Sequence, residues 1–248
     1  MSSNPMYREE DFSFSYSSRD INDNPLPQSV FQKFQDLAGN SAEELGVGYN
    51  TLKEKDLIWV VVKQRYIVLK DVPFENLKSF TWPHPKKSIE YNREYKITDY
   101  KGEPLIIGIS KWCVCNIKTR KLDLKGVDYI GNEYHQENNF PSLPYINLKP
   151  VDTSDLKPSL IHQVVFTELD HNRHMNNTYY ASLIIDSIPG MADYKIEDMQ
   201  INFLSECHLG EELSIYTVKM QSDNEYQVLG VKKDMSLSFN SYLKLKHI

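Results

Sequence analysis

The segment QSVFQKFQDLAGNSAEEL, residues 28–45, decides the fold class. Its apolar side chains recur at intervals of three and four residues, which places them on one face of an α-helix. They are Val30, Phe31, Phe34, Leu37, Ala38, Ala42 and Leu45. The spacing therefore predicts one long amphipathic helix that ends near Gly46.

Strand-like segments lie on both sides of this helix. Aromatic residues alternate with serines toward the end of residues 7–16, which is the period of a half-buried strand. Runs rich in β-branched and aromatic residues predict further strands at 56–70, 78–83, 88–98 and 104–117. A long helix between a first strand and an antiparallel sheet can bury its apolar face against that sheet, so we predict an α+β fold.

The same order of elements restarts after an aperiodic segment rich in glycine and proline. A strand at 161–167, a helix at 177–188 and strands at 198–204, 212–220, 226–233 and 237–245 are predicted there. The repeat is one of element order, without evident residue identity. We therefore predict a first domain at 1–125, a linker at 126–158 and a second domain at 159–248, with the two sheets side by side as a pseudo-dimer.

Composition narrows the class of protein. Of 248 residues, 40% are hydrophobic and 25% are charged, which is typical of a globular chain, and no apolar run approaches the roughly 20 residues that span a bilayer. The net charge of −6 argues against nucleic-acid binding.

The N-terminus resembles neither a signal nor a transit peptide. The three cysteines form no C-x-x-C motif and fit a reduced compartment, so we expect a cytoplasmic protein.

The stretch TELDHNRHMNNTYYASL, residues 167–183, carries the clearest candidate chemistry. Asp170, Asn172 and His174 alternate, and an extended backbone would send all three side chains toward one pocket. A histidine exchanges protons near neutral pH, and an asparagine donates or accepts hydrogen bonds. The alternative is an ordinary polar loop before a helix.

Several motifs in this chain, in family order, resemble those of the acyl-acyl-carrier-protein thioesterases. The D-x-N-x-H-x-N-N-x-x-Y pattern is present as Asp170, Asn172, His174, Asn176, Asn177 and Tyr180, followed by Glu206-Cys207, and the first half has Thr81-Trp82-Pro83, Trp112 and Thr119-Arg120. The resemblance implies two tandem hotdog domains and hydrolysis of fatty acyl thioesters of the carrier protein. Because no plastid transit peptide is recognisable, we expect a bacterial-type member.

The resemblance also implies that Asp170, Asn172, His174 and Glu206 form the catalytic set, while the first domain selects the acyl chain. We expect His174 and Glu206 to activate a water molecule, with Asp170 ordering the loop and the start of the following helix favouring an oxyanion. A second version uses Cys207 as nucleophile. We prefer water, since the adjacent Glu206 disfavours a thiolate.

Other sites and partners carry weaker signals. His162, His171 and His208 lack the close spacing of zinc ligands, so we expect no metal and no cofactor. The basic residues Lys118, Arg120 and Lys121 are candidates for docking an acidic acyl carrier protein, and the alternative is a solvated strand end.

Two other functions remain open from the sequence. One is hydrolysis of acyl-coenzyme A thioesters, and the other is a non-catalytic acyl-binding hotdog protein. The chain length and unsaturation of the acyl group are not predicted. The sequence also leaves open whether two chains associate as a homodimer.

Overall fold

A computed structural model describes residues 6–131, 133–139 and 143–248. The chain divides into two compact units: unit 1 holds the described residues up to Ser15 and those from Phe31 to Pro144, and unit 2 holds Tyr16–Val30 and Tyr145–Ile248. The boundaries therefore differ from the predicted domain ranges. Residues 1–5 of the predicted first domain and residues 132 and 140–142 of the predicted linker lie outside the described residues.

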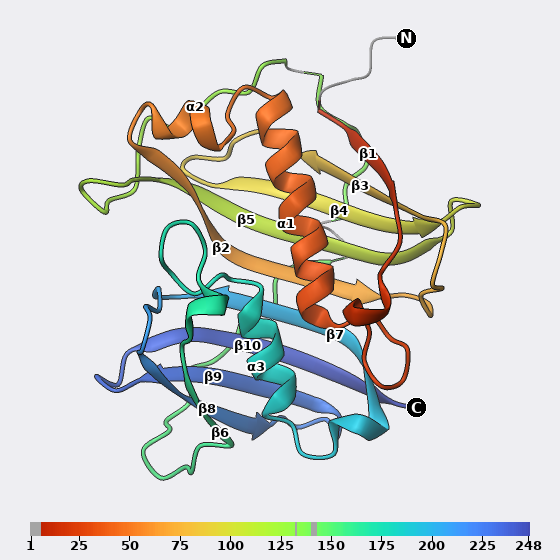
Figure 1. Ribbon diagram of the computed structural model, residues 1–248, viewed down its shortest axis with the longest axis vertical. Helices are drawn as coiled ribbons and strands as arrows, with labels where there is room; N and C mark the ends of the chain where they lie inside the picture. The colour runs from red at the N-terminus through yellow and green to blue at the C-terminus, as the bar shows by residue number, and fades with distance from the viewer. Residues whose placement is uncertain (1–5, 132, 140–142) are drawn as a thin grey trace. The chain divides into compact units, whose positions relative to one another are not determined.

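Unit 1 contains five antiparallel strands and a long helix, shown in red to green in Figure 1. The strands are β1 (Arg8–Phe12), β2 (Leu57–Val68), β3 (Leu77–Pro83), β4 (Tyr91–Asp99) and β5 (Pro104–Asn116). The helices are α1 (Pro27–Glu44), whose first residues belong to unit 2, and the short α2 (Tyr49–Lys53). The sequence did not indicate α2, because its five residues include one buried apolar side chain, Leu52, and show no period.

Unit 2 repeats this arrangement with a shorter helix. Its strands are β6 (Leu160–Gln163), β7 (Tyr194–Phe203), β8 (Glu212–Lys219), β9 (Glu225–Lys232) and β10 (Leu237–His247), and its helix is α3 (Tyr179–Asp186). Single 3-10 turns lie at Tyr16–Ser18, Phe166–Glu168 and Met191–Asp193. The predicted strand at 161–167 was too long, because the chain leaves β6 for the second of these turns.

Strand pairing is the same in both units. The order is β1-β3-β4-β5-β2 in unit 1 and β6-β8-β9-β10-β7 in unit 2, and every pair is antiparallel. Numbered within its own unit, each sheet therefore reads 1-3-4-5-2, with a helix between the first and second strands. Each unit is a hotdog domain, which confirms the predicted α+β fold of two tandem hotdog domains.

The helix of each unit packs on its own sheet. All seven apolar residues predicted on one face of α1 are buried. Phe34 stacks on Tyr95 of β4 with ring centroids 4.2 Å apart, and the Phe34 ring fills the space where a side chain on Gly108 of β5 would lie. In unit 2, Tyr180 of α3 packs edge-on against Phe239, with ring centroids 5.4 Å apart. Figure 1 shows α1 and α3 each lying across a face of its sheet.

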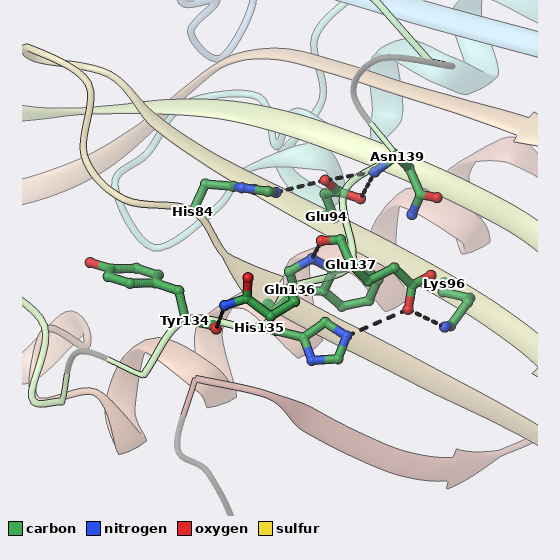
Figure 2. A network of polar contacts seen from close by, with 9 residues as sticks. His84, Glu94, Lys96, Tyr134, His135, Gln136, Glu137 and Asn139 are labelled. Atoms are coloured by element: carbon green, nitrogen blue, oxygen red, sulfur yellow. Dashed lines mark hydrogen bonds and ion pairs between the residues drawn. The ribbon is translucent and has the colours of Figure 1, made fainter.

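The predicted linker does not behave as a free connection. Its first part packs on unit 1: Val127 is buried, and the buried carboxylate of Glu94 accepts hydrogen bonds from the Asn139 N–H at 3.0 and 2.8 Å. Glu137 pairs with Lys96 at 2.6 Å in the same network (Figure 2). From Tyr145 onward the chain belongs to unit 2. The aperiodic segment is thus held by individual contacts, which leave no regular pattern in the sequence.

Two tryptophans of unit 1, Trp82 and Trp59, take part in ordinary packing. Trp82 is fully buried, and its indole N–H donates to the Glu137 carbonyl at 3.0 Å. Trp59 donates to the Val47 carbonyl at 2.8 Å and packs against the core of unit 1. Among the described residues, no helix combines the length and apolar character needed to cross a membrane.

Candidate active site

The polar stretch before α3 forms a tight turn, and the predicted extended backbone was wrong. The Asp170 N–H donates to the His174 carbonyl at 2.8 Å, and the Arg173 N–H donates to the Asp170 carbonyl at 3.0 Å. Arg173 adopts a left-handed backbone conformation with φ of 65°. A turn of this kind redirects the chain within four residues, so alternation of side chains does not apply here.

Asp170 holds the turn together. One carboxylate oxygen accepts hydrogen bonds from the Asn172 N–H at 2.8 Å and the His174 N–H at 3.1 Å. Hydrogen bonds to an ionised carboxylate are among the stronger ones in proteins. This geometry agrees with the expectation that Asp170 orders the loop. The side chain of Asn172 is half-buried at the tip of the same turn.

His174 and Glu206 lie side by side, although 31 residues separate them in the sequence. The Nε2 atom of His174 is 3.4 Å from an Oε atom of Glu206. Glu206 lies in the loop after β7, and two contacts join this loop to the turn: the Met175 N–H donates to the Cys207 carbonyl at 2.8 Å, and His174 forms an isolated β-bridge with His208. The backbone therefore fixes where the two side chains meet.

The pair is sheltered but reachable from solvent. The His174 side chain is 14% exposed and the Glu206 side chain is 34% exposed. Lys232 of β9 donates to the Glu206 carbonyl and forms an ion pair with Glu211 at 3.4 Å. A histidine beside a carboxylate can accept a proton and keep the resulting imidazolium stabilised, which is what activation of a water molecule requires.

Cys207, the alternative nucleophile, is placed differently. Its side chain is 0% exposed, and its sulfur lies 3.0 Å from the Ser238 hydroxyl in the interior of unit 2. Burial and the neighbouring Cys207 raise the pKa of the Tyr180 phenol well above its usual range. A thiol enclosed in this way cannot reach a thioester carbonyl without a rearrangement of the core, so the geometry favours water.

The start of α3 offers fewer free donors than expected. The helix begins at Tyr179, two residues later than predicted. Asn176 accepts hydrogen bonds from two N–H groups at the start of this helix. Its side-chain oxygen accepts from the Thr178 N–H at 3.0 Å, and its carbonyl accepts from the Tyr179 N–H at 3.0 Å. The Ala181 N–H donates to the Thr178 carbonyl at 3.3 Å. We therefore do not assign the oxyanion to this helix terminus.

A second histidine lies beside the pair. The His208 ring centroid is 4.9 Å from that of His174, at an angle of 73° between the ring planes. The other two candidates from the sequence lie elsewhere: His162 pairs with Glu168 at 2.9 Å, and His171 is exposed on the turn. Sequence reasoning grouped His208 with these two and missed its place next to His174. The sequence signal that could have placed His208 there is its position two residues after Glu206.

The turn has a copy 150 residues earlier in the chain, which sequence reasoning also missed. Asp20 accepts hydrogen bonds from the Asn22 N–H at 2.8 Å and the Asn24 N–H at 2.9 Å, as Asp170 does from Asn172 and His174. Asp23, at the position of Arg173, has a φ of 62°. The sequence signal for this copy is the similarity between the D-x-N-x-N pattern at 20–24 and the D-x-N-x-H pattern at 170–174.

The candidate carrier-docking residues lie on the turn after β5. Lys118, Arg120 and Lys121 are all exposed. The Asn116 side chain accepts hydrogen bonds from the N–H groups of Lys118 and Thr119 at 3.1 and 2.9 Å, which fixes the turn. Lys118 also forms an ion pair with Asp56 at 2.6 Å, so part of its charge is compensated.

The fold and the site together define a tandem hotdog protein with a histidine–carboxylate pair in its second domain. Residues 6–129 match the family described as acyl-ACP thioesterase N-terminal domain, and residues 154–238 match its C-terminal domain. The chain therefore belongs to the acyl-ACP thioesterase family.

Individual relatives agree with this assignment. The chain is 24% identical over 208 residues to a chloroplastic oleoyl-acyl carrier protein thioesterase of Coriandrum sativum, covering 75% of this chain and 56% of that protein. It is 27% identical over 194 residues to a chloroplastic palmitoyl-acyl carrier protein thioesterase of Arabidopsis thaliana, covering 73% and 47%. The chain thus spans about half the length of the curated relatives that it matches.

Solved structures show the same fold. An acyl-ACP thioesterase from Bacteroides thetaiotaomicron superposes with a TM-score of 0.83 at 21% identity, covering 99% of this chain and 100% of that one. A 12:0-ACP thioesterase from Umbellularia californica superposes with a TM-score of 0.82 at 17% identity, covering 98% of both chains.

Proposed function

We propose that this protein hydrolyses the thioester of fatty acyl-acyl carrier protein and releases a free fatty acid and the carrier thiol. The observation that carries the proposal is the contact between His174 and Glu206, which are 3.4 Å apart and partly exposed in the second hotdog domain. Membership in the acyl-ACP thioesterase family supports the substrate class. We expect no cofactor, because water serves as the nucleophile and a histidine as the base.

The proposed mechanism uses water as nucleophile. His174 takes a proton from the water as its oxygen attacks the thioester carbonyl carbon, and Glu206 stabilises the imidazolium that results. The carbon–sulfur bond then breaks, and the imidazolium returns the proton to the departing sulfur. Asn172 is assigned to orienting the water or the carbonyl oxygen, and Asp170 to holding Asn172 and His174 in place through their N–H groups.

A panel of thioesters tests this proposal directly. The full chain is incubated with acyl-acyl carrier protein and acyl-coenzyme A substrates of several chain lengths, and released fatty acid and thiol are measured. We expect turnover of carrier-bound substrates, and a loss of turnover in His174→Ala. Preference for coenzyme A thioesters would favour the second candidate function, and the absence of turnover on every substrate would favour a non-catalytic acyl-binding role.

Cys207→Ala separates the two nucleophiles. Because the thiol is buried against Ser238, we expect the variant to keep most of its turnover and to lose some stability, since it leaves a small cavity and removes one of the contacts of the Ser238 hydroxyl, which still donates to the Ser205 carbonyl at 3.0 Å. Complete loss of turnover in a folded variant would instead assign the nucleophile to Cys207. Thermal unfolding of the variant serves as the folding control.

We also propose that the turn carrying Lys118, Arg120 and Lys121 docks the acidic carrier protein. Reversing these three charges is expected to raise KM for carrier-bound substrates and to leave KM for a carrier-free thioester unchanged. Lys53→Glu, Lys101→Glu and Lys233→Glu together are a matched control, because these residues are equally exposed and lie outside the turn. An equal effect of both triple variants would reduce the docking site to general electrostatic attraction.

Location and assembly remain predictions. We propose a cytoplasmic location, which rests on the sequence pattern alone and is tested by fractionation of cells that produce the chain. Association into a homodimer is tested by sedimentation of the purified chain.

A further inference from the structure

Three potential metal ligands from two separate segments meet at the candidate active site. A ring nitrogen of His174, a carboxylate oxygen of Glu206 and a ring nitrogen of His208 all lie within 4.8 Å of one another. His174 comes from the turn before α3, and the other two come from the loop after β7. We propose that these three residues bind a divalent transition metal such as Zn²⁺, and that the bound metal inhibits the protein.

The spacing is close to what zinc requires. Ligand atoms about 2.0–2.2 Å from a tetrahedral zinc ion lie about 3.3–3.6 Å from each other. The His174 and Glu206 atoms are already 3.4 Å apart. His208 is exposed, so its ring can close the remaining gap of at most about 1.5 Å by rotation without disturbing the core.

The donor chemistry also fits. Two imidazole nitrogens and one carboxylate oxygen form a ligand set that zinc uses in proteins, with the fourth position left for a water molecule. The backbone holds both segments in place, because His174 and His208 form a β-bridge and the His208 N–H donates to the Glu211 carboxylate at 3.0 Å. Lys232 donates to the Glu206 carbonyl, and its charge is partly compensated by Glu211 at 3.4 Å.

Inhibition follows from which atoms the metal occupies, and this part rests on the proposed function. The metal takes a ring nitrogen of His174 and the Glu206 carboxylate, so it replaces the contact by which Glu206 would stabilise the imidazolium. The imidazole of His174 acts as a base only while the lone pair of the accepting nitrogen is free. The prediction that the protein needs no resident metal is unchanged, because the proposed ion is an inhibitor.

Binding is tested with the metal alone, so the result does not depend on turnover. The full chain is titrated with Co²⁺, which reports tetrahedral nitrogen and oxygen coordination by its visible absorption, and Zn²⁺ is then added to displace it. We expect one bound ion per chain, and at least about 10-fold weaker binding in His208→Gln, since loss of a ligand should cost no less than loss of its supporting contacts. His171→Gln, which removes an exposed histidine of the same turn, should bind Co²⁺ as the unchanged protein does.

Inhibition is measured in parallel as turnover with Zn²⁺ divided by turnover of the same variant without it. We expect Zn²⁺ to inhibit the unchanged protein and His171→Gln, a chelator to reverse this, and His208→Gln to be inhibited only at Zn²⁺ concentrations at least about 10-fold higher. Absence of Co²⁺ binding, or equal binding by His208→Gln and the unchanged protein, would overturn the site. Activation by Zn²⁺ would overturn its inhibitory role. A chain that binds Co²⁺ but hydrolyses no thioester would retain the metal site and refute the proposed function.

Discussion

Two turns of this chain share the same backbone hydrogen bonds and carry different side chains. In both, a 3-10 turn leads to an aspartate whose N–H donates to the carbonyl four residues later, at 2.9 Å for Asp20 and Asn24 and at 2.8 Å for Asp170 and His174. The residue before each acceptor has a left-handed φ. A hydrogen bond then closes each turn, from Leu26 to Ser18 at 2.9 Å and from Asn176 to Glu168 at 2.8 Å.

The side chains at the fifth and sixth positions separate the two turns. Asn24 replaces His174, and its amide lies near its own Asp20, at 3.3 and 3.4 Å from the carboxylate oxygens. Pro25 replaces Met175, so the N–H that ties the second turn to the Cys207 carbonyl has no counterpart in the first. The comparison teaches that the same turn can hold different side chains, and that the second turn differs from the first by one histidine and by one hydrogen bond to the loop bearing Glu206.

The largest expected effect comes from giving the second turn the side chain of the first. His174→Asn keeps the backbone hydrogen bonds of the turn but removes the group that accepts a proton. We expect kcat for acyl-carrier-protein thioesters to fall by about 10²- to 10⁴-fold, with little change in melting temperature. Steady-state kinetics and thermal unfolding measure the two. Retention of activity would move the base away from His174.

The aspartates provide a matched pair with a smaller effect. Asp170→Ala and Asp20→Ala each remove a carboxylate that accepts two N–H groups, so each should cost about 1–2 kcal/mol in the free energy of unfolding. Only Asp170→Ala should also lower kcat, by up to about 10²-fold, because it releases the backbone that positions His174. Chemical denaturation and kinetics on both variants test the pair. An equal loss of kcat in both would show that the first turn also supports the reaction.

Helices α1 and α3, most of the strands and their repeat were predictable because they depend on regular side-chain periods. The short α2 shows no such period, and the alternating aromatic residues that predicted the first strand lie mostly past the end of β1. The seven apolar residues predicted on one face of the long helix sit at helical spacing, and all seven are buried, although Leu45 lies just past the end of α1. The duplicated turn escaped detection because only Asp20 and Asn22 match their counterparts, while the hydrogen bonds that define the turn come mostly from the backbone.

The site was predictable only in part. His174 and Glu206 meet through a bridge between distant segments, and no local pattern encodes such a contact, so the resemblance to a family had to supply Glu206. The same reason explains why His208 was grouped with the wrong histidines. Asp170 is different, because an aspartate that accepts N–H groups two and four residues ahead is a local feature of turns.

Glycine substitution at the left-handed residue of each turn should change the stability of the protein by a different, modest amount. A left-handed conformation strains most side chains, and aspartate tolerates it better than arginine does. Arg173→Gly should therefore raise the free energy of unfolding by up to about 1 kcal/mol, after the added entropy of the unfolded chain is counted, and Asp23→Gly should leave it nearly unchanged. Thermal unfolding should show a rise of about 2 °C for Arg173→Gly. A larger rise for Asp23→Gly would contradict this reading.

The smallest effect is expected from placing a histidine in the first turn. Asn24→His in the His174→Ala background reproduces the D-x-N-x-H pattern in the first turn. Pro25 has no N–H, however, so this turn cannot form the hydrogen bond that Met175 makes to the Cys207 carbonyl. Glu206 contacts His174, and no such carboxylate contact is described for Asn24 beyond its own Asp20. We therefore expect the double variant to be as inactive as His174→Ala alone. Turnover more than about tenfold above that of His174→Ala would contradict this expectation. It would mean that a histidine in the first turn can act as a base without the Met175–Cys207 hydrogen bond.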